Sequence, residues 1–269
     1  MLKRKIVITG AGTGLGKYAS IELARRGHTV YAATKLKEEC TYFKEIANKE
    51  NLHINSFKMD ILKKEDLQKL EKIEFDTLIN NAAIGDSGSV MEIHINRFKN
   101  IFETNVLANI NITQIAIKKF MKKKEGKIIF LSSLAGIATG PFLSPYCTSK
   151  FAIESFVKSL RLELKLLKNV NIKIKIIEPG AYKTGFNQKM YKRKYEWMKN
   201  HSYFKNNLDY IMQSEEKLWD LIELKKFNSI IKQYVKAVES NSNKFKYTAP
   251  KLQVFFIKLY KIIELLFSM

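Results

Sequence analysis

The chain has 269 residues, of which 46% are hydrophobic and 27% are charged. It is too long for a disulfide-stapled miniprotein and short for two full domains, and its composition is ordinary for a globular protein. Lys and Arg number 47 against 26 Asp and Glu, a formal net charge of +21 spread along the chain, which leaves a nucleic-acid patch, a membrane patch and a solvated surface open.

Short apolar segments alternate along the chain with longer segments of helical periodicity. The predicted strands are Lys5–Thr9, Thr29–Ala33, His53–Met59, Phe75–Asn80, Gly126–Ser132, Asn171–Glu178 and Lys244–Thr248. The predicted helices between them are Leu15–Arg26, Lys35–Glu50, Asn96–Lys122 and Tyr146–Leu167. Parallel neighbours need crossover helices, so this alternation predicts an α/β fold: a Rossmann-type, doubly wound parallel sheet of about seven strands. We expect one domain over residues 1–249, followed by a C-terminal helical extension over 250–269.

A glycine-rich segment, Thr9 to Gly16, lies between the first predicted strand and the first predicted helix. Gly10 allows a tight turn, Gly14 lets the backbone approach a pyrophosphate, and Gly16 lets the helix pack on the strand. The free N–H groups and the dipole of a helix N-terminus favour an anion at this place. The segment therefore predicts a dinucleotide site.

The residues after the second predicted strand bear on which dinucleotide is bound. A carboxylate there binds a ribose 2′-hydroxyl, and a basic group accommodates a 2′-phosphate. Here Thr34 and Lys35 follow the strand, and the first acidic residue is Glu38. The sequence therefore favours NADP(H) over NAD(H).

A second motif pairs Tyr146 with Lys150 at the start of a predicted helix. Residues four apart share a helix face, so the ammonium can lie beside the phenol and is expected to lower its pKa. The same spacing occurs elsewhere in this chain, but only this pair follows a strand ending in two serines, Ser132 and Ser133.

Together, these segments resemble the short-chain dehydrogenase/reductase family in its ordinary-length, soluble form. The resemblance covers Lys5 to Phe186. Its motifs are, in chain order, Thr9-Gly10-x-x-x-Gly14-x-Gly16, Asp60, Asn80-Asn81-Ala82-Ala83, Asn105, Ser133, Tyr146, Lys150, Pro179-Gly180 and Thr184.

The resemblance implies a Rossmann-fold enzyme that moves hydride between NAD(P)H and a carbonyl or alcohol. The implied catalytic residues are Asn105, Ser133, Tyr146 and Lys150. The implied cofactor-binding residues are Gly10, Thr13, Gly14, Leu15, Gly16, Thr34, Lys35, Asp60, Ile61, Asn81, Ala82, Ala83, Tyr146, Lys150, Pro179, Gly180 and Thr184. Among them, Asp60 is expected by the adenine, Asn81 by the adenine ribose and Thr184 by the nicotinamide carboxamide. Asn105 is expected to hold a water that resupplies protons.

Two cysteines, Cys40 and Cys147, form no disulfide framework and fit a reduced, cytoplasmic setting. The histidines are far apart, so no metal site is expected. Only Ile6 to Ile8 follow the basic start before Thr9, so we expect no export signal. No uncharged apolar run reaches about 18 residues, so we expect no membrane span.

The carboxyl-terminal third is the most individual part of the sequence. Residues 185–225 are expected to form a lid, whose aromatic residues indicate either an apolar substrate or a lid that packs on itself. Interleaved Lys and Tyr are also compatible with nucleic acid, but without an OB or RRM pattern we expect no nucleic-acid partner. The segment 250–269 predicts an amphipathic helix. It could cap the pocket or sheet, pack in a homo-oligomer interface, or lie peripherally on a membrane.

The sequence thus predicts an NADP(H)-dependent oxidoreductase acting on an apolar ketone or secondary alcohol, with lipid-like, steroid-like and acyl-chain substrates all open. Two alternatives stay open as well. One is a 3-oxoacyl-thioester reductase of fatty-acid synthesis, because a basic surface suits an acidic carrier. The other is a nucleotide-sensing protein that keeps the fold without turnover.

Overall fold

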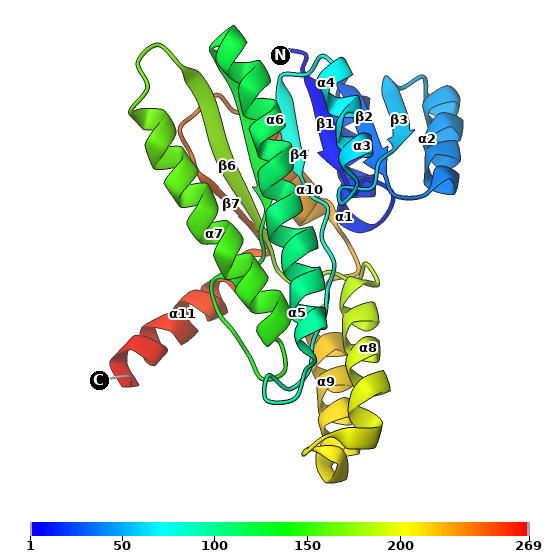
Figure 1. Ribbon diagram of the computed structural model, residues 1–269, viewed down its shortest axis with the longest axis vertical. Coiled ribbons are helices and arrows are strands. Elements are labelled where there is room, and N and C mark those ends of the chain that lie inside the picture. Colours follow the sequence, from blue (N-terminus) through cyan, green and yellow to red (C-terminus); the bar gives the residue numbers. More distant parts are fainter. Residues whose placement is uncertain (1, 268–269) are drawn as a thin grey trace.

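A seven-stranded parallel sheet is the centre of the computed structural model, which describes residues 2–267 (Figure 1). The strand order is β3-β2-β1-β4-β5-β6-β7, so the chain winds outward from β1 in both directions and the predicted doubly wound fold is confirmed. The strands are β1 (Lys5–Thr9), β2 (Thr29–Thr34), β3 (Ile54–Lys58), β4 (Thr77–Asn80), β5 (Glu125–Leu131), β6 (Asn171–Pro179) and β7 (Lys246–Ala249).

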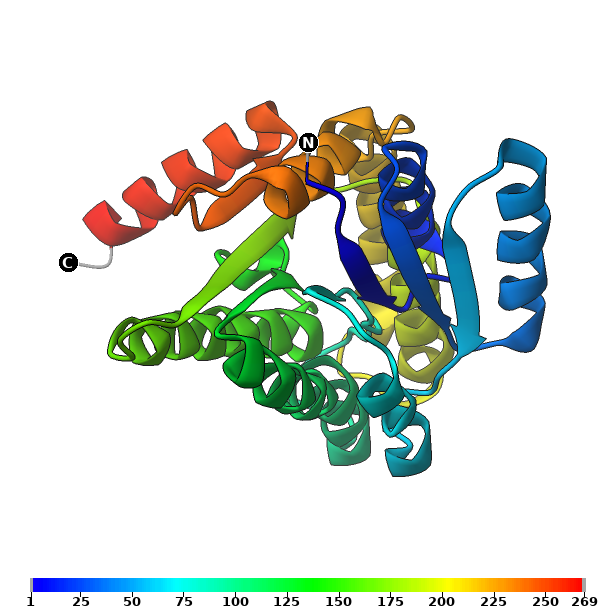
Figure 2. The same cartoon turned by 90° about the horizontal axis from the view of Figure 1, so that it is seen from above.

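Helices cover both faces of the sheet (Figure 2). One apolar core lies between the sheet and a first layer, and a second core lies on the opposite face. The first layer consists of α1 (Gly14–Arg25), α2 (Lys37–Glu50) and α10 (Asn228–Glu239). The second consists of α3 (Lys64–Leu67), α4 (Lys69–Lys72), α6 (Ala108–Lys123) and α7 (Ser144–Lys165). Because both faces are covered, the central strands are uniform apolar runs rather than alternating ones.

The helix predicted over Asn96–Lys122 is not a single regular helix. It consists of α5 (Ile95–Phe102), a π-helical turn over Glu103–Leu107, and α6. A π turn inserts an extra residue into the helical ladder and is often found at functional sites. This one carries Asn105, which is 1% exposed.

The predicted lid is a helical hairpin beyond the carboxyl ends of the strands (Figure 1). It contains α8 (Phe186–His201), a 3₁₀ turn (Lys205–Asn207) and α9 (Leu208–Ile222). Its own small core includes the buried side chains of Tyr195, Met198 and Leu208. Four lid aromatics, Tyr191, Tyr195, Trp197 and Phe204, belong to this core or pack against it, which favours a lid that packs on itself.

The last helix, α11 (Lys251–Phe267), projects from the body next to β7 (Figures 1 and 2). The last two residues of the predicted 250–269 helix lie outside the described part of the chain. Phe255, Phe256 and Ile262 are all more than half exposed, so this apolar surface does not cap the sheet or the pocket. Within residues 2–267, no helix has both the length and the apolar character needed to cross a membrane.

Candidate active site

The predicted site residues meet at one edge of the sheet. All strand pairs are parallel, so the carboxyl ends of the strands share this edge. The glycine loop follows β1, Asn81 follows β4, Ser133 follows β5, and Gly180 follows β6. The fold therefore collects residues from distant parts of the sequence into one cleft, as expected for open α/β sheets.

The glycine loop adopts a conformation that side chains rarely allow. Gly10 has φ of +61° and Gly14 has φ of +54°. A Cβ on Gly10 would lie 2.7 Å from the Cα of Ala82, and one on Gly14 would lie 3.7 Å from the Cβ of Thr184. No side chain caps the first turn of α1 at Thr13. The N–H groups of the first turn of α1 are thus available to an anion. Thr184 faces the glycine loop from the other side of the cleft.

The side chain of Asn81 is hydrogen-bonded to the backbone of this glycine loop. Its Nδ2 donates to the carbonyl oxygens of Thr9 at 2.9 Å and Gly10 at 3.1 Å. Its Oδ1 accepts a 2.8 Å hydrogen bond from the Tyr234 hydroxyl on α10. The amide is fully engaged within the protein, so a contact with an adenine ribose would use backbone atoms of Asn81. Sequence analysis missed Tyr234, because it lies 153 residues from Asn81 and belongs to no local motif.

The end of the cleft beside β2 and β3 carries charges of both signs. Lys35 is well exposed, and its Nζ lies 3.6 Å from Oδ2 of Asp60. Glu39 accepts a 3.1 Å hydrogen bond from the backbone N–H of Leu36, and its carboxylate packs on Gly12. A Cβ at Gly12 would lie 2.1 Å from a Glu39 oxygen. A 2′-phosphate at Lys35 would therefore have two carboxylates nearby.

The other predicted cofactor residues line or support the cleft. Thr34 ends β2 and donates to the carbonyl oxygen of Leu36 at 2.9 Å. Ile61 is buried in the second core, and Leu15 packs against the first. Pro179 is the last residue of β6. The side chains of Ile61 and Leu15 therefore contribute to core packing, in addition to any contact with a nucleotide.

Three of the four predicted catalytic residues lie together. Tyr146 and Lys150 are one turn apart on α7, and the Tyr146 phenol is hydrogen-bonded to Ser133. Lys150 is 2% exposed. Its Nζ donates a 2.9 Å hydrogen bond to the carbonyl oxygen of Leu131 and lies 5.6 Å from the centre of the Tyr146 ring. The ammonium therefore lies near the Tyr146 ring, with its hydrogen bond directed to the backbone at the end of β5.

The protonation of this pair differs from the sequence-based expectation. Burial raises the pKa of Tyr146 above its usual value, and the hydrogen bond with Ser133 offsets only part of the rise. The lowered phenol pKa expected from Lys150 is not found, because the effect of burial is larger than any stabilisation of the phenolate by neighbouring groups. Burial lowers the pKa of Lys150 itself to about 8, although Glu154 acts in the opposite direction.

The fourth predicted residue, Asn105, is a rigid link behind the cleft. Its Oδ1 accepts from the N–H of Ile84 at 2.8 Å, and its Nδ2 donates to the carbonyl oxygen of Ile84 at 2.9 Å. Nδ2 also donates to Oγ of Ser149 on α7 at 3.1 Å. Asn105 therefore joins the π turn to the segment after β4 and to the catalytic helix. Its predicted hold on a water stays a prediction.

The lid places an aromatic ring beside Tyr146, the predicted catalytic tyrosine. The rings of Phe186, the first residue of α8, and Tyr146 have centroids 5.4 Å apart. Gly85, in the segment after Ala83, leaves room for Phe186 and Met190: a Cβ there would lie 3.0 Å from Phe186 and 3.1 Å from Met190. The wall of the cleft above the phenol is therefore apolar.

Known proteins share this chain's pattern. A family model described as "short chain dehydrogenase" matches residues 4–195. The uncharacterized oxidoreductase YusZ of Bacillus subtilis is 34% identical over 193 residues, which are 68% of this chain and 67% of that protein. The NADPH-dependent 3-dehydrocapnine reductase of Ornithobacterium rhinotracheale is 30% identical over 196 residues, covering 67% of this chain and 66% of the relative.

A solved structure shares the fold over nearly the whole chain. It is a short chain dehydrogenase/reductase from Burkholderia phymatum in complex with NAD, with a TM-score of 0.80 at 19% identity. The superposition covers 98% of this chain and 95% of the other. In contrast, the matched segments span about two thirds of the two curated relatives, and the family match ends within α8. The end of the lid, α9, α10 and α11 lie beyond it.

Proposed function

The chain belongs to the short-chain dehydrogenase/reductase family of oxidoreductases, and from that premise we propose that it interconverts an apolar ketone and a secondary alcohol with NADP(H). The observation that carries this proposal is the placement of Tyr146, Ser133 and Lys150 across the cleft edge from the glycine loop. The half-buried phenol, the apolar wall above it and the anion-binding loop are what such a reaction needs.

The chemistry follows from these groups. A bound nicotinamide supplies the hydride in the reductive direction. Ser133 and Tyr146 donate hydrogen bonds to the carbonyl oxygen, where negative charge develops. Tyr146 then gives its proton to that oxygen as the general acid, and its raised pKa keeps it protonated until that step. The nearby ammonium of Lys150 stabilises the phenolate that remains.

The glycine loop and the α1 N-terminus fit a dinucleotide pyrophosphate, and Lys35 supports NADP(H) as the dinucleotide. Lys35 is the cation after β2, and its side chain is exposed enough to reach a 2′-phosphate. Asp60 and Glu39 act against it by repelling that phosphate. The preference for NADP(H) over NAD(H) is thus a balance of charges, in which Lys35 attracts the 2′-phosphate and the two carboxylates repel it.

Replacing Lys35 tests this balance. In Lys35→Glu, the KM for NADPH should rise about tenfold or more, because a charge-assisted hydrogen bond to the 2′-phosphate is lost. The KM for NADH should change little. Steady-state kinetics with both cofactors would measure this, with Lys37→Glu as a nearby surface control. An unchanged NADPH-to-NADH preference in Lys35→Glu would remove Lys35 from cofactor selection.

An apolar substrate is supported by the ring of Phe186 over the Tyr146 phenol. A charged or strongly hydrated substrate would lose water there without gaining a partner. The rival within the same chemistry is a 3-oxoacyl-thioester reductase, which the net charge of +21 favours because acyl carriers are acidic.

The deciding experiment is NADPH oxidation by the full chain against a panel of long-chain ketones, short polar ketones, aldehydes and 3-oxoacyl thioesters, repeated with NADH. We expect the highest kcat/KM with an apolar ketone and NADPH. The highest value with carrier-bound thioesters would support the rival. The absence of turnover across the panel, with NADPH binding intact, would support a nucleotide-sensing protein instead.

A further inference from the structure

One half of α11 is an exposed apolar surface. Seven side chains that share one half of the helix are 42% to 67% exposed. We call this surface the outward face of α11; it consists of Leu252, Phe255, Phe256, Leu259, Tyr260, Ile262 and Ile263. The partly buried side chains Gln253, Val254 and Ile257 lie on the other half, toward the body. Such a contiguous apolar surface on a protein marks an interaction site.

The root of α11 is fixed beside the cleft. Gln253 accepts a 2.7 Å hydrogen bond from the N–H of Ala181 and donates one of 2.7 Å to the carbonyl oxygen of Ile222. Gly180 packs so closely on this root that a Cβ would lie 2.9 Å from Cδ of Pro250. The helix is therefore anchored to the segment after β6 and to the end of the lid, at the same edge of the sheet as Tyr146.

Basic residues border the outward face. At 100° per residue, Lys251 and Lys258 fall directly beside Phe255 and Ile262, and both lysines are exposed. The other border carries Gln253 and the exposed Glu264. An apolar half with lysines along one border is the pattern of a helix that lies in the interface of a bilayer, where lysine stems extend toward anionic headgroups. The chain as a whole adds a net charge of +21.

We propose that the outward face of α11 docks on an anionic lipid bilayer and holds the mouth of the cleft at the membrane surface. A second copy of this chain fits the face less well, because two chains of charge +21 repel each other, whereas an anionic surface attracts each of them. The exposed Leu218 and Leu221 lie at the end of α9 that Gln253 binds, so further exposed apolar side chains lie on the lid near the root of α11. The consequence, that substrate enters from the bilayer, rests on the proposed function.

Vesicle flotation with the full chain tests the docking. The vesicles contain phosphatidylcholine alone, or phosphatidylcholine with phosphatidylglycerol at equal amounts. We expect the chain to float with the anionic vesicles only. Phe255→Glu/Phe256→Glu should reduce the bound fraction about tenfold or more, because two charges enter the apolar layer. Lys251→Glu/Lys258→Glu should weaken binding about fivefold for each lysine.

The matched control is Leu162→Glu/Leu166→Glu, which changes two exposed leucines four residues apart, Leu162 on α7 and Leu166 at the C-cap of that helix. This variant should float like the unaltered chain. Equal flotation of Phe255→Glu/Phe256→Glu and the control would overturn the proposal, as would a chain that stays unbound. A dimer in analytical ultracentrifugation that the Phe255/Phe256 variant converts to monomers, without flotation of the unaltered chain, would assign the face to a second copy.

Flotation needs neither cofactor nor substrate, so it separates this inference from the proposed function. A chain that floats but does not turn over any ketone would keep the docking surface and lose the proposed activity. A chain that reduces apolar ketones but does not float would keep the activity and lose the docking surface.

Discussion

Two buried lysines at opposite ends of β5 have the same kind of perturbation and different surroundings. Lys150 donates to the carbonyl oxygen of Leu131 at the end of the strand, and Lys127 lies near its start. They are 2% and 1% exposed. Burial lowers the pKa of Lys150 to about 8 and that of Lys127 to about 7. Only Lys150 lies beside a half-buried tyrosine and opposite a glycine loop.

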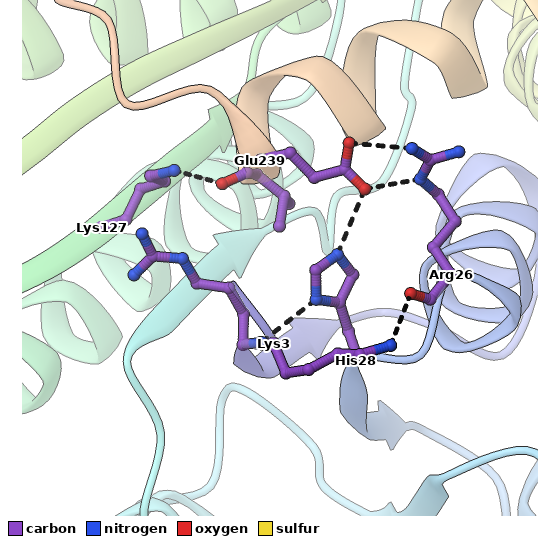
Figure 3. Close-up of polar contacts among 7 residues, drawn as sticks. Lys3, Arg26, His28, Lys127 and Glu239 are labelled. Carbon is purple, nitrogen blue, oxygen red and sulfur yellow. Dashed lines mark hydrogen bonds and ion pairs between the residues drawn. The ribbon is translucent and has the colours of Figure 1, made fainter. Parts of the chain in front are cut away.

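The Lys127 end of the sheet is a support for α10. Lys127 Nζ donates to the carbonyl oxygens of Val238 and Ser240, at the carboxyl end of that helix. Beside it, Arg26 donates two hydrogen bonds to Glu239, of 2.5 and 3.0 Å, and the ring of His28 lies 3.4 Å from the same carboxylate (Figure 3). Cations at the carboxyl end of a helix interact favourably with the negative end of its dipole, and they donate hydrogen bonds to its free carbonyl groups.

The comparison shows that a lowered lysine pKa does not identify a catalytic residue. Burial is the largest cause at both ends of β5, because the charged form loses hydration, and neighbouring cations such as Lys175 and Arg4 add to it at Lys127. What distinguishes the catalytic end is the set of neighbours: the phenol of Tyr146, the hydroxyl of Ser133 and the anion-binding loop. The following changes should therefore separate activity from stability.

The largest effect is expected at the catalytic end. Lys150→Met should lower kcat for ketone reduction about 10²- to 10⁴-fold, because the phenolate of Tyr146 loses its stabilising charge. The fold should remain, as circular dichroism would show. Steady-state NADPH oxidation measures the effect, and a kcat near that of the unaltered chain would end the catalytic role of Lys150.

The matching change at the other end should affect stability instead. Lys127→Met should lower the free energy of unfolding by about 1–3 kcal/mol, because the carbonyls of Val238 and Ser240 lose a buried donor. Its kcat should stay within about twofold of the unaltered value. Urea unfolding and the same kinetic assay measure the two quantities. A large loss of turnover with unchanged stability would contradict the division between the two ends.

The pH dependence of stability tests the same comparison in another way. Folded Lys127 releases its proton near pH 7, whereas an unfolded lysine releases it near 10.5. Between these values the unfolded chain binds more protons, so raising the pH stabilises the fold. The difference in unfolding free energy between the unaltered chain and Lys127→Met should therefore grow in favour of the unaltered chain from pH 7 toward 10.5. A difference that stays constant or shrinks would show that Lys127 keeps its charge inside the fold.

Much of this arrangement could be predicted from local sequence. Apolar runs such as Ile6–Ile8 and Ile128–Phe130 mark buried parallel strands, and the glycine loop has its meaning because it lies between a strand and a helix. Parallel topology then places Ser133 at the same edge of the sheet as that loop, and the family resemblance implies that Tyr146 and Lys150 join it. These features depend on short stretches of chain and on one topological rule.

The rest depends on distant partners. Tyr234 reaches Asn81 across 153 residues, and no spacing indicates that contact. Lys127 begins a strand and looks like a solvated charge, yet α10 covers it. The periodicity of α11 indicates an apolar half, but whether that half faces the body or the exterior depends on how the turn at Pro250 and the contacts of Gln253 direct the helix.

The central claim is that Tyr146 is the proton donor of a nicotinamide-dependent reduction, and Tyr146→Phe tests it most directly. The phenyl ring keeps the packing against Phe186 and removes only the hydroxyl. We expect kcat for ketone reduction to fall about 10²- to 10⁴-fold, with the Kd for NADPH, measured by fluorescence titration, within about twofold of the unaltered value. Turnover near that of the unaltered chain would contradict the account.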